Sequence, residues 1–301
     1  MRNIFLLGLI FIFIFNCTKK ELEEISNERF PILAYDSEIS ESLSMDLSEI
    51  NIDLPRDVIY WSQHFQNPNN DLNNIASKAS FKKKSKIISG KGEPINILQP
   101  IFFNNKLCHV LSNGYLECFD TSIDKKILSI DLKSDGISKY EIIRGGLAYF
   151  DDKVVYVDAY GQVVLINITS QQIEWSTNVG FPILSPPLVY RDRIYFISSD
   201  NRIFSLFFND GSVDWSFQTI SESKKNLFTA SPVAYENTII VPFSNGELVA
   251  FKFDTGRPLW SENLSKFSII TNFDINDISG SPVINKNSIY ALSSNGKLVA
   301  L

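Results

Sequence analysis

Short apolar runs alternate with small polar clusters along most of the chain, and one long stretch shows the pattern clearly. Residues 231–260 read SPVAYENTIIVPFSNGELVAFKFDTGRPLW, in which four segments rich in Val, Ile, Phe and Tyr are separated by Gly, Asn, Asp and Ser. Segments of this length and composition, bounded by turn residues, are typical of strands joined by hairpins. No window of helical period is long enough to compete. The pattern therefore predicts a unit of four antiparallel strands.

The same unit recurs, because a turn residue repeatedly lies fourteen positions before a large apolar residue. The pairs are Gly114 with Leu128, Gly161 with Trp175, Asn201 with Trp215, and Gly246 with Trp260, and Gly296 opens a fifth unit. Successive turn positions lie 47, 40, 45 and 50 residues apart. Periods of about 40–50 residues, each holding four strands, indicate the blades of a β-propeller. The predicted fold class is thus all-β, with a propeller over residues 57–301.

Two positions in each predicted blade have distinct roles. Gly114, Gly161, Asn201, Gly246 and Gly296 mark tight turns, where the backbone favours Gly and Asn. Leu128, Trp175, Trp215 and Trp260 are predicted to pack between neighbouring blades, because a large side chain at a fixed place fills the wedge there. Stacking of the tryptophans on a ligand is the alternative.

The last predicted blade is incomplete. Leu301 lies five residues after Gly296, at the place of Phe251 in the preceding unit, where earlier units continue into a turn and a fourth strand. About four and a half blades do not close a ring, and an open sheet edge leaves backbone groups unpaired. We expect the sequence to be a C-terminal truncation of a longer protein. The alternative is an edge covered by oligomerisation or by a partner strand.

The first 56 residues differ from the repeats. Residues 1–17 combine a basic Arg2, an unbroken apolar run and then Cys17, which is typical of a secretory signal that ends at a lipidated cysteine. Asn16 is bulkier than the small residue usual before such a cysteine, so an uncleaved or conventionally cleaved signal is the alternative. Residues 18–56 are polar and acidic, and they predict a flexible tether between the lipid anchor and the folded domain.

Composition and motifs offer few candidate catalytic or ligand-binding residues. The net charge of −6 argues against nucleic acid as a partner. The chain has two histidines, His64 and His109, and lacks the HExxH, CxxC and GxSxG patterns. Asp274 and Asp277 offer two carboxylates without further oxygen ligands, too few to indicate a calcium site. We therefore predict no catalytic residue, no metal site and no cofactor.

Cys108 and Cys118 lie on the two arms of the hairpin KLCHVLSNGYLECF, and their relation depends on the turn. A two-residue Asn-Gly turn pairs Cys108 with Phe119 and sends the two sulfurs to opposite faces. A three-residue loop with Gly114 at the bulge position sets Cys108 opposite Cys118, where an oxidising compartment permits a disulfide. Both registers remain open at this point.

Several stretches together resemble a known family. The unit over residues 231–260 is similar to the PQQ-like propeller repeat. The ordered set LPRDVIYWSQHFQNPNN, GKGEP, NGELVAFKFDTGRPLWSENL and FDINDISGSPVINKNSIYALSSNGKLVAL looks like the BamB family, lipoproteins of the outer-membrane β-barrel assembly machinery. The resemblance extends from about residue 55 to the end. It implies an eight-bladed, non-enzymatic scaffold, lipid-anchored to the periplasmic face of the cell outer membrane.

The same resemblance implies binding partners, and two alternative functions stand beside the scaffold. The implied partners are a POTRA domain of BamA, the other subunits of the machinery, and unfolded outer-membrane proteins. A PQQ-dependent quinoprotein dehydrogenase of the same superfamily is one alternative. Such enzymes hold PQQ with calcium and place an adjacent pair of cysteines over the cofactor, whereas no two cysteines are adjacent here. A generic periplasmic binding propeller for peptides or glycans is the other alternative.

The partner surface is expected on loops, because their lengths vary while packing constrains the strands. The connections between units span residues 129–146, 176–186, 216–231 and 261–281. Two of them, with the sequences NVGFPIL and FDINDI, supply the candidate contacts Phe181, Ile183, Leu184, Asp274 and Asp277. Ordinary packing between blades is the alternative for each.

Overall fold

β-Branched and aromatic residues form nineteen short strands in the part of the chain that the computed structural model describes. That part is residues 52–72, 74–76, 98–111, 113–133, 144–220, 230–265, 277–278 and 280–301, and it contains no helix long and apolar enough to cross a membrane. The predicted signal and most of the predicted tether lie outside it. Arg56, the last residue of that tether, pairs with Ile75 in a parallel bridge.

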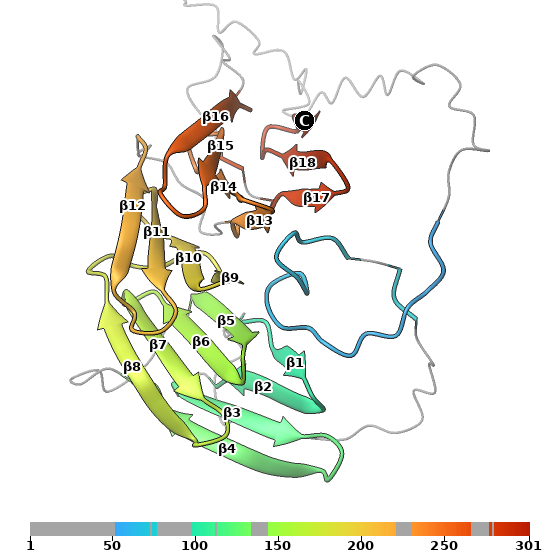
Figure 1. The fold of residues 1–301 in the computed structure, drawn as a ribbon, viewed down its shortest axis with the longest axis vertical. Helices are drawn as coiled ribbons and strands as arrows, with labels where there is room; N and C mark the ends of the chain where they lie inside the picture. The colour runs from blue at the N-terminus through green and yellow to red at the C-terminus, as the bar shows by residue number, and fades with distance from the viewer. Residues whose placement is uncertain are drawn as a thin grey trace, which may run out of the picture. The chain divides into compact units, whose positions relative to one another are not determined.

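The strands form five antiparallel sheets in chain order (Figure 1). The first sheet holds β1 (Ile101–Phe103), β2 (Lys106–Val110), β3 (Tyr115–Asp120) and β4 (Lys125–Asp131), and the second holds β5 (Gly145–Phe150), β6 (Lys153–Asp158), β7 (Gln162–Asn167) and β8 (Gln172–Asn178). The third holds β9 (Leu188–Tyr190), β10 (Arg193–Ile197), β11 (Arg202–Phe207) and β12 (Val213–Gln218), and the fourth holds β13 (Val233–Tyr235), β14 (Thr238–Pro242), β15 (Glu247–Lys252) and β16 (Pro258–Asn263). The last holds β17 (Val283–Asn285), β18 (Ser288–Leu292) and β19 (Leu298–Ala300).

Successive sheets contact each other through their first strands, β1 with β5, β5 with β9, β9 with β13 and β13 with β17. These strands are therefore the innermost ones. Apolar side chains fill the space between neighbouring sheets; between the third and fourth, for example, Ile197 and Phe251 belong to one buried cluster. Meanders whose first strands converge in this way are propeller blades, so the predicted all-β propeller fold is confirmed.

All five predicted turn residues lie between the second and third strands of their sheets and have positive φ. The φ angles are 84° at Gly114, 80° at Gly161, 63° at Asn201, 83° at Gly246 and 81° at Gly296. In each case the backbone N–H donates to the carbonyl three residues earlier, as from Gly246 to Phe243 at 3.2 Å. Left-handed backbone of this kind is open to Gly and tolerated by Asn, which explains why these two residue types share the position.

Two of the large apolar residues pack on the last turn of the following sheet. The indole N–H of Trp175 donates to the carbonyl of Phe208 at 3.1 Å, and that of Trp215 donates to Phe253 at 3.1 Å. A Cβ on Gly211 would lie only 2.5 Å from Cε3 of Trp175, so the indole lies directly against the glycine backbone. The two tryptophans therefore join sheets both by apolar contact and by a hydrogen bond.

The remaining two positions differ from each other. Leu128 is buried in the cluster that joins the first and second sheets. Trp260, on β16, is among the exposed apolar side chains. Packing between sheets thus accounts for Leu128 and for the tryptophans of β8 and β12, while a packing role for Trp260 stays a prediction.

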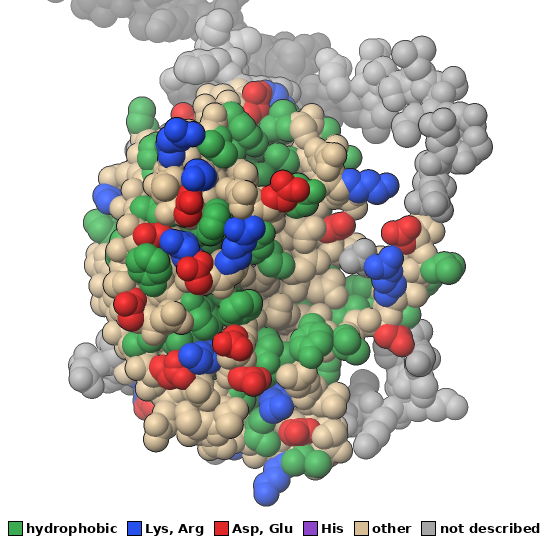
Figure 2. All heavy atoms as spheres, viewed as in Figure 1, with side chains coloured by type: hydrophobic (Ala, Val, Ile, Leu, Met, Phe, Trp, Pro, Cys, Tyr) green, Lys and Arg blue, Asp and Glu red, His purple; other side chains and the backbone are tan. Residues whose placement is uncertain are grey.

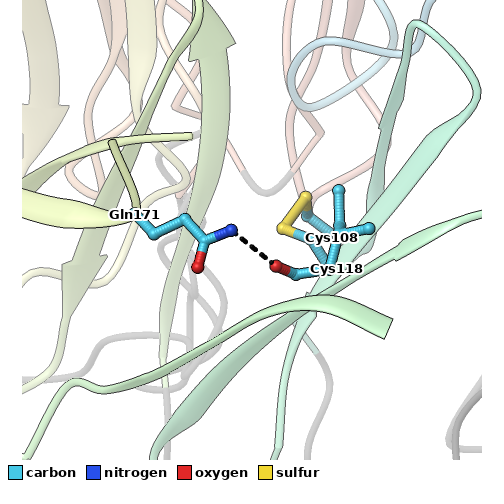
Figure 3. The surroundings of a disulfide bond; sticks show 4 residues. Cys108, Cys118 and Gln171 are labelled. Carbon is cyan, nitrogen blue, oxygen red and sulfur yellow. Dashed lines mark hydrogen bonds between the residues drawn. A yellow bond between two sulfur atoms is a disulfide. The ribbon is translucent and has the colours of Figure 1, made fainter. Parts of the chain in front are cut away.

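The hairpin of β2 and β3 adopts the register with the longer loop. Leu111 N–H donates to the carbonyl of Tyr115 at 2.8 Å, and Cys108 lies directly opposite Cys118. The two sulfurs form a disulfide with an S–S distance of 2.03 Å, and both cysteines are fully buried (Figure 3). Close by, the side chain of Gln171, in the turn between β7 and β8, donates to a backbone carbonyl of β4 at 3.0 Å. The disulfide therefore lies within the junction of the first two sheets.

The double variant Cys108→Ala with Cys118→Ala should lose about 2–3 kcal/mol of unfolding free energy, because the cross-link closes a short loop and restricts the unfolded chain. Guanidinium denaturation with and without reductant measures this loss. Reductant should weaken the wild-type protein by a similar amount and leave the double variant unchanged. A fully reduced wild-type protein with unaltered stability would contradict the expectation.

Candidate partner-binding surface

The connection between β8 and β9 contains the apolar stretch at residues 178–184, and the turns of two neighbouring sheets hold it. Val179 N–H donates to the carbonyl of Gly161 at 2.9 Å, and Ile183 N–H donates to Asp158 at 3.1 Å. On the other side, Ser199 N–H donates to the carbonyl of Pro182 at 2.8 Å. Backbone bonds to both sheets fix the course of this loop, so the side chains that it exposes have defined positions.

Phe181 is the exposed aromatic residue of this loop, and it lies against a charged group of the next sheet. The guanidinium of Arg202 is 5.3 Å from the centre of the Phe181 ring, a cation–π arrangement. Arg202 also donates to Asp200 at 3.3 Å and to Gln218 at 2.6 Å. An ion pair at the surface adds little stability, but these bonds hold the guanidinium in one orientation beneath the ring.

Two further exposed apolar residues lie at the same end of the sheets as this pair. Tyr160 accepts a bond from the side chain of Asn178 at its backbone carbonyl, at 3.0 Å, and Ile220 accepts one from Asn201 at 3.0 Å. Both side chains are exposed. We name Tyr160, Phe181, Arg202 and Ile220 the turn-face patch, since all four lie at the end of the sheets that carries the glycine turns. Aromatic residues and arginine are enriched where proteins bind each other.

The structure places the predicted contact residues in different environments. Phe181 is exposed and Leu184 is partly buried. Ile183 is fully buried in the cluster between the second and third sheets, and Asp277 is also buried. The prediction of partner contacts by Ile183 and Asp277 is therefore wrong, because their side chains are enclosed by the protein itself. Asp274 lies outside the described residues.

Tyr160, Arg202 and Ile220 were not among the residues selected from the sequence. Tyr160 and Arg202 are direct neighbours of the turn residues Gly161 and Asn201. That adjacency is a usable signal, because a residue beside a tight turn is held at the end of its sheet. Nothing in the local sequence distinguishes Ile220 from a buried isoleucine.

The two histidines occupy structural surroundings. The ring of His64 bonds the side chain of Gln99 at 2.9 Å, and burial lowers the pKa of His64 against the opposing effect of that bond. His109 lies opposite Glu117 in the β2–β3 pair; burial lowers the pKa of His109 while Glu117 acts to raise it. Across the described ranges, no group of three or more His, Cys, Asp or Glu side chains is placed to hold a metal ion.

Charge is mixed on the face that Figure 2 draws. On the face drawn in Figure 2, acidic and basic side chains alternate and neither sign forms a continuous field. Apolar side chains lie exposed between them (Figure 2). Such a face is suited to apolar contact with another protein more than to steering a strongly charged partner.

A family profile, curated relatives and solved structures are similar to this chain. The profile of the family described as outer membrane protein assembly factor BamB matches residues 112–301. A protein of that name from Yersinia pestis is 25% identical over 195 residues, which cover 63% of this chain and 50% of the relative. The crystal structure of BamB from Moraxella catarrhalis has a TM-score of 0.60 at 20% identity, covering 68% of this chain and 60% of that one.

A quinohemoprotein alcohol dehydrogenase from Comamonas testosteroni also shares the fold, with a TM-score of 0.54 at 13% identity over 69% of this chain and 41% of that one. At such identities the likeness to solved structures shows the fold alone. The chain spans about half the length of the curated relatives that it matches. Because the family profile covers more than half of the chain, this protein belongs to the outer membrane protein assembly factor BamB family.

Proposed function

We propose that this protein is a non-enzymatic scaffold of the outer-membrane β-barrel assembly machinery, lipid-anchored through Cys17 on the periplasmic face of the outer membrane. Membership of a family named for outer-membrane protein assembly supports the role. The signal-like sequence that ends at Cys17 supports the anchor, and the acidic stretch at residues 18–56 supports a tether between anchor and propeller.

The turn-face patch is the observation that carries the partner assignment. It combines an exposed aromatic ring, Phe181, with a guanidinium that Asp200 and Gln218 already hold in place. Side chains that are fixed before binding lose little conformational freedom when a partner arrives, so more of the contact energy remains as affinity. We assign this patch to a POTRA domain of BamA.

The double variant Phe181→Ala with Arg202→Ala should reduce the recovery of BamA at least about tenfold, because buried aromatic and arginine side chains dominate binding energy at interfaces. The measurement is affinity purification of the full chain from detergent-solubilised membranes, with co-purifying proteins quantified by mass spectrometry. Tyr235→Ala is the matched control. Tyr235 is 38% exposed against 37% for Phe181, and it lies at the opposite end of its sheet.

Three outcomes separate the parts of this proposal. Equal recovery of BamA with both variants would place the contact outside the turn-face patch. A wild-type chain recovered from membranes without BamA would contradict the scaffold role. A chain absent from the membrane fraction would contradict the anchor at Cys17.

A further inference from the structure

Each innermost strand has one edge that its own sheet leaves free. In the antiparallel pair of β13 and β14, Tyr235 lies opposite Thr238, next to the turn. Residues along an antiparallel strand point their N–H groups alternately toward and away from the partner strand, and the N–H of Ala234, the residue before Tyr235, points away from β14. The equivalent residues of the other innermost strands are Phe102, Tyr149, Val189 and Ile284. An unpaired N–H inside a protein is unfavourable, and a free strand edge is a template for pairing with another chain.

One segment of the chain pairs this position in all five sheets. We name residues 61–71 the inner strap; Figure 1 shows it in blue, on the side where the innermost strands lie. In the first sheet, Phe102 N–H donates to the carbonyl of Trp61 at 2.9 Å, and Trp61 N–H donates back at 2.6 Å. In the second, Tyr149 N–H donates to the carbonyl of Ser62 at 2.6 Å.

The strap continues across the other three sheets in the same order. Val189 N–H of the third sheet donates to the side-chain oxygen of Gln63 at 3.1 Å. In the fourth sheet, Ala234 N–H donates to the carbonyl of Pro68 at 2.8 Å, and in the fifth, Ile284 N–H donates to the carbonyl of Asn69 at 2.9 Å. The order of acceptors along the strap follows the order of the sheets, as a single continuous segment requires.

Asparagine side chains add to the strap at its far end. Asn69 donates to the carbonyl of Ile284 at 3.1 Å, which completes a two-way pairing with β17. Asn70 is buried and donates to the carbonyl of Pro282 at 3.0 Å, at the entry to the fifth sheet. A buried amide with such a bond is costly to replace, since removing it leaves the carbonyl unpaired.

We propose that the inner strap is an intramolecular ligand of the free inner edges, which accepts one N–H from each of the five sheets and thereby holds the sheets together. Each inner edge donates one N–H to the strap, to a backbone carbonyl in four sheets and to the side-chain oxygen of Gln63 in the third, and the occupant is the chain's own residues 61–71. Any other strand that pairs with these edges must first displace the strap. This inference does not depend on the proposed binding of BamA.

Hydrogen exchange of the full chain tests the strap. Asn69→Ala combined with Asn70→Ala should speed amide exchange at Ile284 and throughout β18 and β19 at least about tenfold. The fifth sheet then lacks the side-chain bonds from Asn69 and Asn70, so it should open as a unit. Asn74→Ala is the control, since the side chain of Asn74 donates to the carbonyl of Asp53 at 3.0 Å, outside the strap. That variant should exchange like wild type.

A second variant keeps the test informative if the double variant fails to fold. Gln63→Ala removes the acceptor of Val189 and should speed exchange at that amide and in β9, with β14 and β15 unchanged. Wild-type protection at Ile284 and Val189 in these variants would overturn the pairing. Loss confined to Ile284, with β18 and β19 still protected, would overturn the role in holding the sheets together.

Discussion

Replacing Leu248 with alanine should lower the free energy of unfolding by about 2–5 kcal/mol, whereas Leu298→Ala should lower it by less than about 1 kcal/mol. The two leucines hold the same place in successive units, two residues after Gly246 and Gly296. Leu248 is fully buried in the cluster between the fourth and fifth sheets, and its loss leaves a cavity there. Leu298 is 66% exposed, so its truncation removes few contacts.

Urea denaturation of the two variants beside the wild-type protein checks this difference. The dependence of free energy on denaturant must stay the same in all three, because a changed slope would mean that the variant altered the compactness of the unfolded or native state or no longer unfolds in one step. Similar losses at Leu248 and Leu298 would show that the outer face of the last sheet is covered in solution. The pair therefore also reports whether that face has a partner.

Gly256→Ala should destabilise the protein by about 2–5 kcal/mol, because it combines backbone strain with overpacking. Gly256 has a φ of 63°, and a Cβ there would lie 2.4 Å from Cδ2 of Trp215. Gly180→Ala is the matched control, with a φ of 78° and nothing within 4 Å of its Cβ. The control carries only the strain of left-handed backbone, about 1–2 kcal/mol, so the difference between the variants measures the contact with the indole.

Guanidinium denaturation followed by tryptophan fluorescence suits this comparison, because Trp215 is itself the group that the new methyl displaces. The emission of Gly256→Ala should differ from wild type in the native state, and that of Gly180→Ala should not. Equal losses of stability in both variants would mean that Trp215 moves aside without cost, and that its packing on the turn does not join the third and fourth sheets.

The shared fold does not separate the family's assembly factors from quinoprotein dehydrogenases, because one fold hosts different functions. The dehydrogenase resembles this chain at a TM-score of 0.54, close to the 0.60 of the assembly factor. The distinction rests on the family profile over residues 112–301.

Local features of the chain were predictable from the sequence. The segment ELVAFK is the strand β15, and the glycine before it is a left-handed turn, as the pattern indicated. The same holds for the fourteen-residue spacing that places Trp175 and Trp215 in the last strands of their sheets. Strand alternation and the demand of a turn for positive φ act over a few residues, so a short window of sequence contains them.

Tertiary structure decided the features that depend on distant partners. The sequence left two registers for Cys108 and Cys118, and the packed sheet selected the one that sets them opposite each other. Ile183 belongs to a loop-like apolar stretch, yet it is buried because the second and third sheets close around it. The inner strap shows no strand pattern in the sequence. Its bonding partners lie far away along the chain: Asn69, for example, pairs with Ile284, more than two hundred residues away. The sequence alone determined the four-stranded units and their turns. The contacts between units form only when the folded chain brings distant strand edges and sheet faces together. Those contacts do not depend on the local conformational preferences of the residues that form them.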